Sequence, residues 1–101
     1  MGRKDAILEA INRVEHPEIA MSLLDLGMVR DIEYNPQDNG VILTLVVPFF
    51  GIPQAVRDYM VNSLSKAIKD AGSELKNVNV AQMIEEEREA FFQKEHARWR
   101  G

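Results

Sequence analysis

The sequence has no cysteine among its 101 residues and only two histidines, His16 and His96. Without thiols the chain can form no disulfide, has no cysteine nucleophile, and offers no thiolate ligand to zinc or to an iron–sulfur cluster. Two histidines far apart in the sequence are too few for a metal site built from several imidazoles. We therefore expect this chain to hold no metal and no cofactor.

The sequence also lacks an excess of positive charge and any long hydrophobic run. Lys and Arg number 12 against 16 Asp and Glu, which gives a net charge of -4 and disfavours a nucleic-acid-binding surface. No apolar stretch approaches the roughly 18 residues that cross a membrane, and residues 1–5 are not followed by the apolar segment of a secretory leader. We expect a cytoplasmic protein that binds neither nucleic acid nor membranes.

What the sequence does contain is the alternation of elements typical of one small α+β domain. Helical spacing of apolar residues predicts helices over 5–16, 53–71 and 85–98, and strand-like patterns cover 28–34, 41–47 and 77–81. Turn-forming residues at 35–40 predict a hairpin between the first two strands. The third strand follows a helical crossover, so we expect a three-stranded mixed sheet with helices packed on one face.

Three short motifs carry a family resemblance. They are Val14-Glu15-His16-Pro17-Glu18-Ile19, Leu24-Asp25-Leu26-Gly27-Met28-Val29, and the stretch 43–53 that ends in Gly51-Ile52-Pro53. In their order and spacing they resemble the SufT-like (PaaD-like) iron–sulfur cluster assembly family. The resemblance implies the fold described above over residues 1–83, with 84–101 as a C-terminal helical extension.

The chain departs from the family pattern at two positions. His16 stands where the family has an Asp, and Ile52 stands where the family has a reactive Cys if the following proline is matched to Pro53. Glu18, Asp25 and Gly27 agree with the pattern. The resemblance therefore implies a fold and a pathway, but no chemistry that depends on a thiol.

The function that this resemblance implies is that of a non-catalytic adaptor in the maturation of iron–sulfur proteins, whose partners are assembly or recipient proteins. An alternative is a small assembly subunit of a multicomponent oxygenase, as in the PaaD-like branch. A third reading is a metal-binding hydrolase or isomerase with His16 and Glu18 as a base and its orienter. No obvious nucleophile supports the third reading, so we expect no enzymatic activity.

The predicted binding surface takes residues from all three motifs. Its residues are His16, Glu18, Asp25, Phe49, Phe50, Gly51, Ile52 and Pro53. The loop 49–52 is unusually apolar, and it is predicted either to form an exposed docking patch or to fold inward as part of the core. Ile52 is predicted as the N-cap of the next helix, where an apolar side chain leaves backbone amides that Glu18 or a bound anion could satisfy.

The last predicted helix is charged apart from Phe91, Phe92 and Trp99. With Ile84 these residues fall on roughly one helical face. Such a narrow apolar stripe has two interpretations, which the sequence leaves open. The helix packs on its own domain, or it contacts a partner, and a second copy in a homodimer is one such partner.

Overall fold

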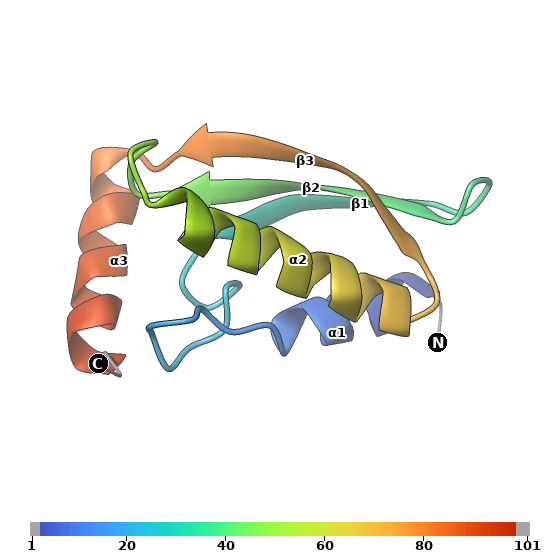
Figure 1. The fold of residues 1–101 in the computed structure, drawn as a ribbon, viewed down its shortest axis with the longest axis horizontal. Coiled ribbons are helices and arrows are strands. Elements are labelled where there is room, and N and C mark those ends of the chain that lie inside the picture. Colours follow the sequence, from blue (N-terminus) through green and yellow to red (C-terminus); the bar gives the residue numbers. More distant parts are fainter. Residues whose placement is uncertain (1–2, 99–101) are drawn as a thin grey trace.

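The computed structural model describes residues 3–98 of the chain and contains the predicted element order. The elements are α1 (Arg3–Asn12), β1 (Val29–Asn35), β2 (Gly40–Val47), α2 (Gln54–Asp70), β3 (Glu74–Gln82) and α3 (Glu85–Arg98). Figure 1 shows α1 and α2 on one face of the sheet, while α3 stands across one end. The α+β class and the order helix, strand, strand, helix, strand, helix are confirmed.

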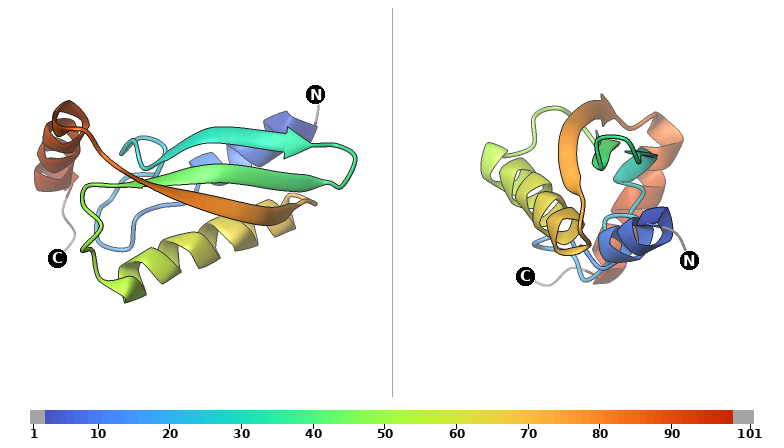
Figure 2. Two further views of the ribbon diagram at one scale, coloured as in Figure 1. Left: turned by 90° about the horizontal axis from the view of Figure 1, so that it is seen from above. Right: turned by 90° about the vertical axis from the view of Figure 1, so that its right-hand side faces the viewer.

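The sheet has the strand order β1-β2-β3, so the apolar strand β2 lies in the middle. β1 pairs antiparallel with β2 through the predicted hairpin, and β3 pairs parallel with β2 after the α2 crossover. This mixed pairing is the predicted one, and Figure 2 shows it from two further sides. β3 is longer than predicted because its pairing follows β2 along its whole length, from Gly40↔Glu74 to Val47↔Gln82.

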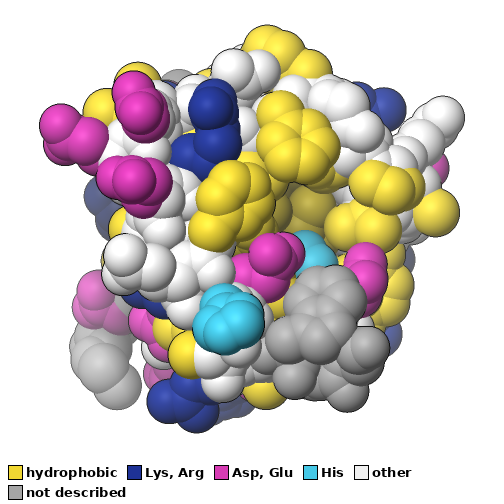
Figure 3. Space-filling model, turned by 90° about the vertical axis from the view of Figure 1, so that its left-hand side faces the viewer, with side chains coloured by type: hydrophobic (Ala, Val, Ile, Leu, Met, Phe, Trp, Pro, Cys, Tyr) yellow, Lys and Arg dark blue, Asp and Glu magenta, His cyan; other side chains and the backbone are white. Residues whose placement is uncertain are grey.

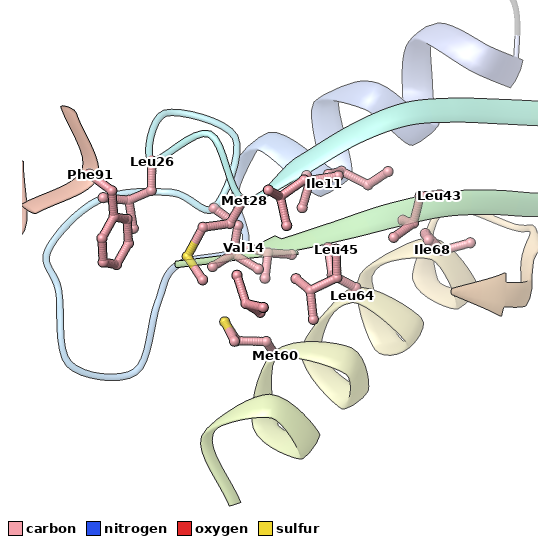
Figure 4. Close-up of a cluster of buried hydrophobic side chains, with 14 of the residues drawn as sticks. Ile11, Val14, Leu26, Met28, Leu43, Leu45, Met60, Leu64, Ile68 and Phe91 are labelled. Atoms are coloured by element: carbon pink, nitrogen blue, oxygen red, sulfur yellow. The ribbon is translucent and has the colours of Figure 1, made fainter. Parts of the chain in front are cut away.

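The core lies between the sheet and the two helices beneath it (Figure 4). Met60, Leu64 and Ile68 recur every four residues of α2 and are fully buried, as the helical spacing predicts. They meet Leu43 and Leu45 of β2. Because one face of α2 covers this part of the sheet, the first turn of the helix is held at the same end of the molecule as α3.

The second motif forms a tight, capped turn that leads into β1. The Ser22 hydroxyl accepts a hydrogen bond from the Asp25 amide at 3.1 Å. At the end of the turn the Met28 amide donates to the Leu23 carbonyl and the Gly27 amide to the Leu24 carbonyl, at 2.9 and 3.0 Å. This is the Schellman arrangement, which requires a residue with positive φ, and Gly27 has φ +75. The motif's glycine is thus explained by backbone geometry.

The last helix packs on its own domain. The side chain of Phe91 is 3% exposed and lies beside Leu26 (Figure 4). The Arg88 side chain donates to the Pro48 carbonyl at 2.9 Å, and the Arg98 carbonyl accepts from the Ala20 amide at 2.9 Å. Contacts at the start, middle and end of α3 therefore fix it across the end of the sheet.

The predicted apolar stripe of α3 is only partly buried. Ile84 precedes the helix and is 62% exposed, and Phe92 is 41% exposed next to the buried Phe91. Trp99 lies outside the described residues. Of the two interpretations of this helix, packing on the parent domain is therefore observed for Phe91, while Phe92 and Ile84 keep exposed apolar surface.

Candidate functional site

A small pocket opens at the end of the molecule where α3 crosses the sheet. Its walls come from the loop after α1, the loop between β2 and α2, the first turns of α2 and the inner side of α3. The lining residues are His16, Glu18, Met28, Pro48, Phe49, Ile52, Pro53, Val56, Met60, Phe91, Phe92 and Glu95, and the cavity volume is about 160 Å³. We call this cavity the end pocket. Figure 3 faces this end and shows hydrophobic side chains around a hollow, with acidic and histidine side chains beside it.

His16 lies in the turn that follows α1 and is 7% exposed. Its Nδ1 accepts a hydrogen bond from the Glu18 amide at 3.0 Å, across Pro17, and its own amide donates to the Met21 carbonyl at 3.2 Å. A ring nitrogen that accepts a hydrogen bond carries no proton, so in the neutral ring the proton is on Nε2. The imidazole thus holds the turn in place, and the turn directs Glu18 to the end pocket.

The loop between β2 and α2 carries the third motif. Phe49 is 46% exposed and Phe50 is 61% exposed, so the two aromatic rings are not folded into the core. Ile52 differs from them because it is partly buried and packs against the core cluster. The two interpretations of this apolar loop therefore apply to different residues: Phe49 and Phe50 are exposed, and Ile52 faces inward.

The prediction that Ile52 caps α2 is wrong, because the N-cap is Pro53. Proline at this position provides no side-chain hydrogen bond to the helix, and the described residues contain no other side chain that caps it. In particular, Glu18 does not bind these amides in the structure. The backbone amides of Val56 and Arg57 instead bond to the Pro53 carbonyl at 3.1 and 3.2 Å.

Five of the eight predicted surface residues come together in the end pocket, namely His16, Glu18, Phe49, Ile52 and Pro53. Phe50 and Gly51 are in the same loop but do not line the pocket. Asp25 lies apart, in the turn before β1. Its side chain is exposed, and its backbone carbonyl accepts a hydrogen bond from Lys94 Nζ at 2.7 Å.

Sequence reasoning missed the contribution of α3 to this site. The aromatic pair Phe91 and Phe92 signalled an apolar contact, and their rings meet edge to face with centroids 5.7 Å apart. Nothing in the sequence singled out Glu95, which joins them in the pocket wall. Among residues 3–98 no three His, Asp or Glu side chains are grouped so as to hold a metal ion.

Comparison with known proteins agrees with the fold and the motifs. The sequence model of the family described as "Iron-sulfur cluster assembly protein" matches residues 4–81. The chain belongs to this family. The match ends near the end of β3, so α3 and the pocket residues that it provides lie outside it. No curated protein matches the chain.

Among solved structures, the fold is similar to the crystal structure of the Domain of Unknown Function DUF59 from Bacillus anthracis. The TM-score is 0.56 at 17% sequence identity, and the match covers 90% of each chain. At this identity the likeness extends to the fold. No helix within residues 3–98 is both long and apolar enough to span a membrane.

Proposed function

We propose that this protein is a non-catalytic accessory in iron–sulfur protein maturation, which docks an assembly or recipient protein on the end pocket and the adjoining Phe49-Phe50 loop. Membership of the assembly family supports the pathway. The observation that carries the docking surface is that Phe49 and Phe50 are exposed directly beside an apolar pocket. Exposed aromatic side chains next to a pocket are typical of binding hot spots.

Two features favour a non-catalytic role. The chain has no cysteine, so neither sulfur transfer through a thiol nor thiolate ligation is open to it. In addition, His16 uses Nδ1 to accept the hydrogen bond from the Glu18 amide, and Nε2 then carries the proton. An imidazole in that form presents an N–H donor at Nε2 and no available lone pair, so it is not set up as a base.

We place this activity in the cytoplasm, where assembly and recipient proteins would meet the chain. A homodimer through α3 is a second arrangement, which the exposed surface of Ile84 and Phe92 favours. A homodimer of this kind would bring the two end pockets close to the symmetry axis.

The test is a complementation assay in the native host. Loss of the gene is expected to lower the activity of an iron–sulfur enzyme in cell extracts, while an enzyme without a cluster keeps its activity. The double variant Phe49→Asp, Phe50→Asp is expected not to restore activity. Replacing an aromatic residue of a binding hot spot by a smaller or charged residue weakens binding by more than about tenfold.

The matched control is Tyr59→Asp, which charges another aromatic residue that is 52% exposed but does not line the end pocket. This variant is expected to restore activity fully. Restoration by the double variant would show that the loop is not the docking surface. If gene loss lowers only the activity of a multicomponent oxygenase, the chain is an assembly subunit of that oxygenase instead.

A further inference from the structure

The size of the end pocket limits what it can receive. Its volume of about 160 Å³ is about half of the lower limit for cavities that hold drug-sized molecules or cofactors, which begin near roughly 300 Å³. A cavity of this size fits one amino-acid side chain. The pocket therefore suits a single side chain that a partner protein inserts.

The wall of the pocket is apolar and its charged groups are acidic. Phe49, Phe92 and Ile52 provide ring faces and an aliphatic surface, and Glu18 and Glu95 provide two carboxylates. None of the described residues that line the pocket is Lys or Arg. A side chain that complements this wall carries positive charge at its tip and apolar groups along its stem.

Two basic side chains close to this wall are engaged with backbone carbonyls and not with its carboxylates. Arg88 donates to the backbone carbonyls of Pro48 and Met83 at 2.9 and 3.3 Å. Lys94 donates to the Asp25 carbonyl at 2.7 Å. His16 accepts a hydrogen bond at Nδ1, as the neutral ring does.

We propose that the end pocket receives an arginine side chain of the partner protein. Arginine fits better than lysine because its planar guanidinium stacks on aromatic rings, is weakly hydrated, and bonds carboxylates with two parallel hydrogen bonds. The aliphatic stem would lie along Ile52 and Phe49 while the guanidinium reaches Glu18 or Glu95. This inference rests on the proposed docking function and names the chemistry of its partner.

The experiment is a titration of the ¹⁵N-labelled full chain followed by amide chemical shifts. The probe is the peptide acetyl-Gly-Arg-Gly-amide, and the comparison is the same peptide with citrulline, which has the same shape without the charge. We expect the arginine peptide to shift the amides of Glu18, Ile52 and Glu95. We expect the citrulline peptide to bind about tenfold more weakly, and the arginine affinity to fall as salt is added.

Two double variants test whether arginine binds at the end pocket. Glu18→Gln with Glu95→Gln is expected to reduce arginine binding to the level of citrulline. The control, Glu33→Gln with Glu89→Gln, removes the same net charge from exposed residues outside the pocket and is expected to bind arginine like the parent. Amide spectra of the free variants show whether each is folded.

Equal binding of the two peptides, or shifts confined to residues outside the end pocket, would overturn the arginine proposal. The complementation assay separates this failure from failure of the docking function. If Phe49→Asp, Phe50→Asp is inactive while Glu18→Gln, Glu95→Gln restores activity, the docking surface stands and its partner does not insert an arginine. If both variants restore activity, the docking function itself is wrong.

Discussion

At the scale of single residues, the turn before β1 depends on Gly27. Its φ of +75 places it in the left-handed region, and a Cβ built there has no atom within 4 Å. An added Cβ would therefore meet no clash, and its cost would come from backbone strain. The position thus separates the conformational role of glycine from its small size.

We expect Gly27→Val to lower the free energy of unfolding by about 1–3 kcal/mol, because a β-branched residue is strained at positive φ. Urea unfolding measures this change. Gly27→Asn is expected to cost less, since asparagine tolerates this region better. Gly51→Val is the control, because Gly51 is exposed and its nearest neighbour atom to an added Cβ is 3.8 Å away. If the Gly27→Val protein is as stable as the parent, a side chain at position 27 causes no backbone strain.

Asn39 shows what the sequence cannot reveal about a residue. The run of turn formers predicted the hairpin, and Asn39 has the positive φ of 57 that such turns use. The structure adds that its side chain joins distant segments. Oδ1 accepts from the Tyr34 hydroxyl at 2.9 Å and the Ser73 hydroxyl at 3.0 Å, and Nδ2 donates to the Gly72 carbonyl. No local pattern indicates bonds that span over 30 residues.

At the scale of elements, the sequence predicted all six but did not place the last one. Repeats of apolar residues indicate a buried face for α2, whereas α3 offers only Phe91 and Phe92 on a charged helix. The site of α3 depends on contacts with loops far away in the sequence, such as the bond between Arg88 and the Pro48 carbonyl. The end pocket was therefore predicted on its loop side and missed on its helix side.

The two aromatic residues of α3 are expected to differ in their contribution to stability. Phe91→Ala should lower the free energy of unfolding by about 3–5 kcal/mol, because it removes a ring that is 3% exposed from the core. Phe92→Ala should cost clearly less, since this ring is 41% exposed. The measurement is again urea unfolding of each variant.

Truncation after Met83 extends this comparison to the whole helix. The shortened chain should lose at least as much stability as the Phe91→Ala variant, since it also loses the hydrogen bond to the Pro48 carbonyl. If the shortened chain is as stable as the parent, α3 does not belong to the core and the partner interpretation of this helix gains support. A loss from Phe91→Ala as small as that from Phe92→Ala would point the same way.

At the scale of the whole molecule, the lack of cysteine has a direct spectroscopic consequence. The purified chain is expected to show no absorbance band near roughly 400 nm after anaerobic incubation with iron and sulfide, since thiolates are the usual ligands of such clusters. Iron and sulfide should be absent from the desalted protein. A band together with stoichiometric iron and sulfide would show that the chain binds a cluster by other ligands.

The elongated shape has a practical consequence for affinity tags and fusion partners. The molecule measures 39 × 24 × 22 Å, and the start of α1 and the end of α3 lie toward opposite ends of the long axis (Figure 1). The Arg98 carbonyl bonds to the Ala20 amide, a few residues from His16 and Glu18 of the end pocket. A tag attached after α3 would crowd the docking surface and imitate a loss of function. A tag attached before α1 would leave that surface open.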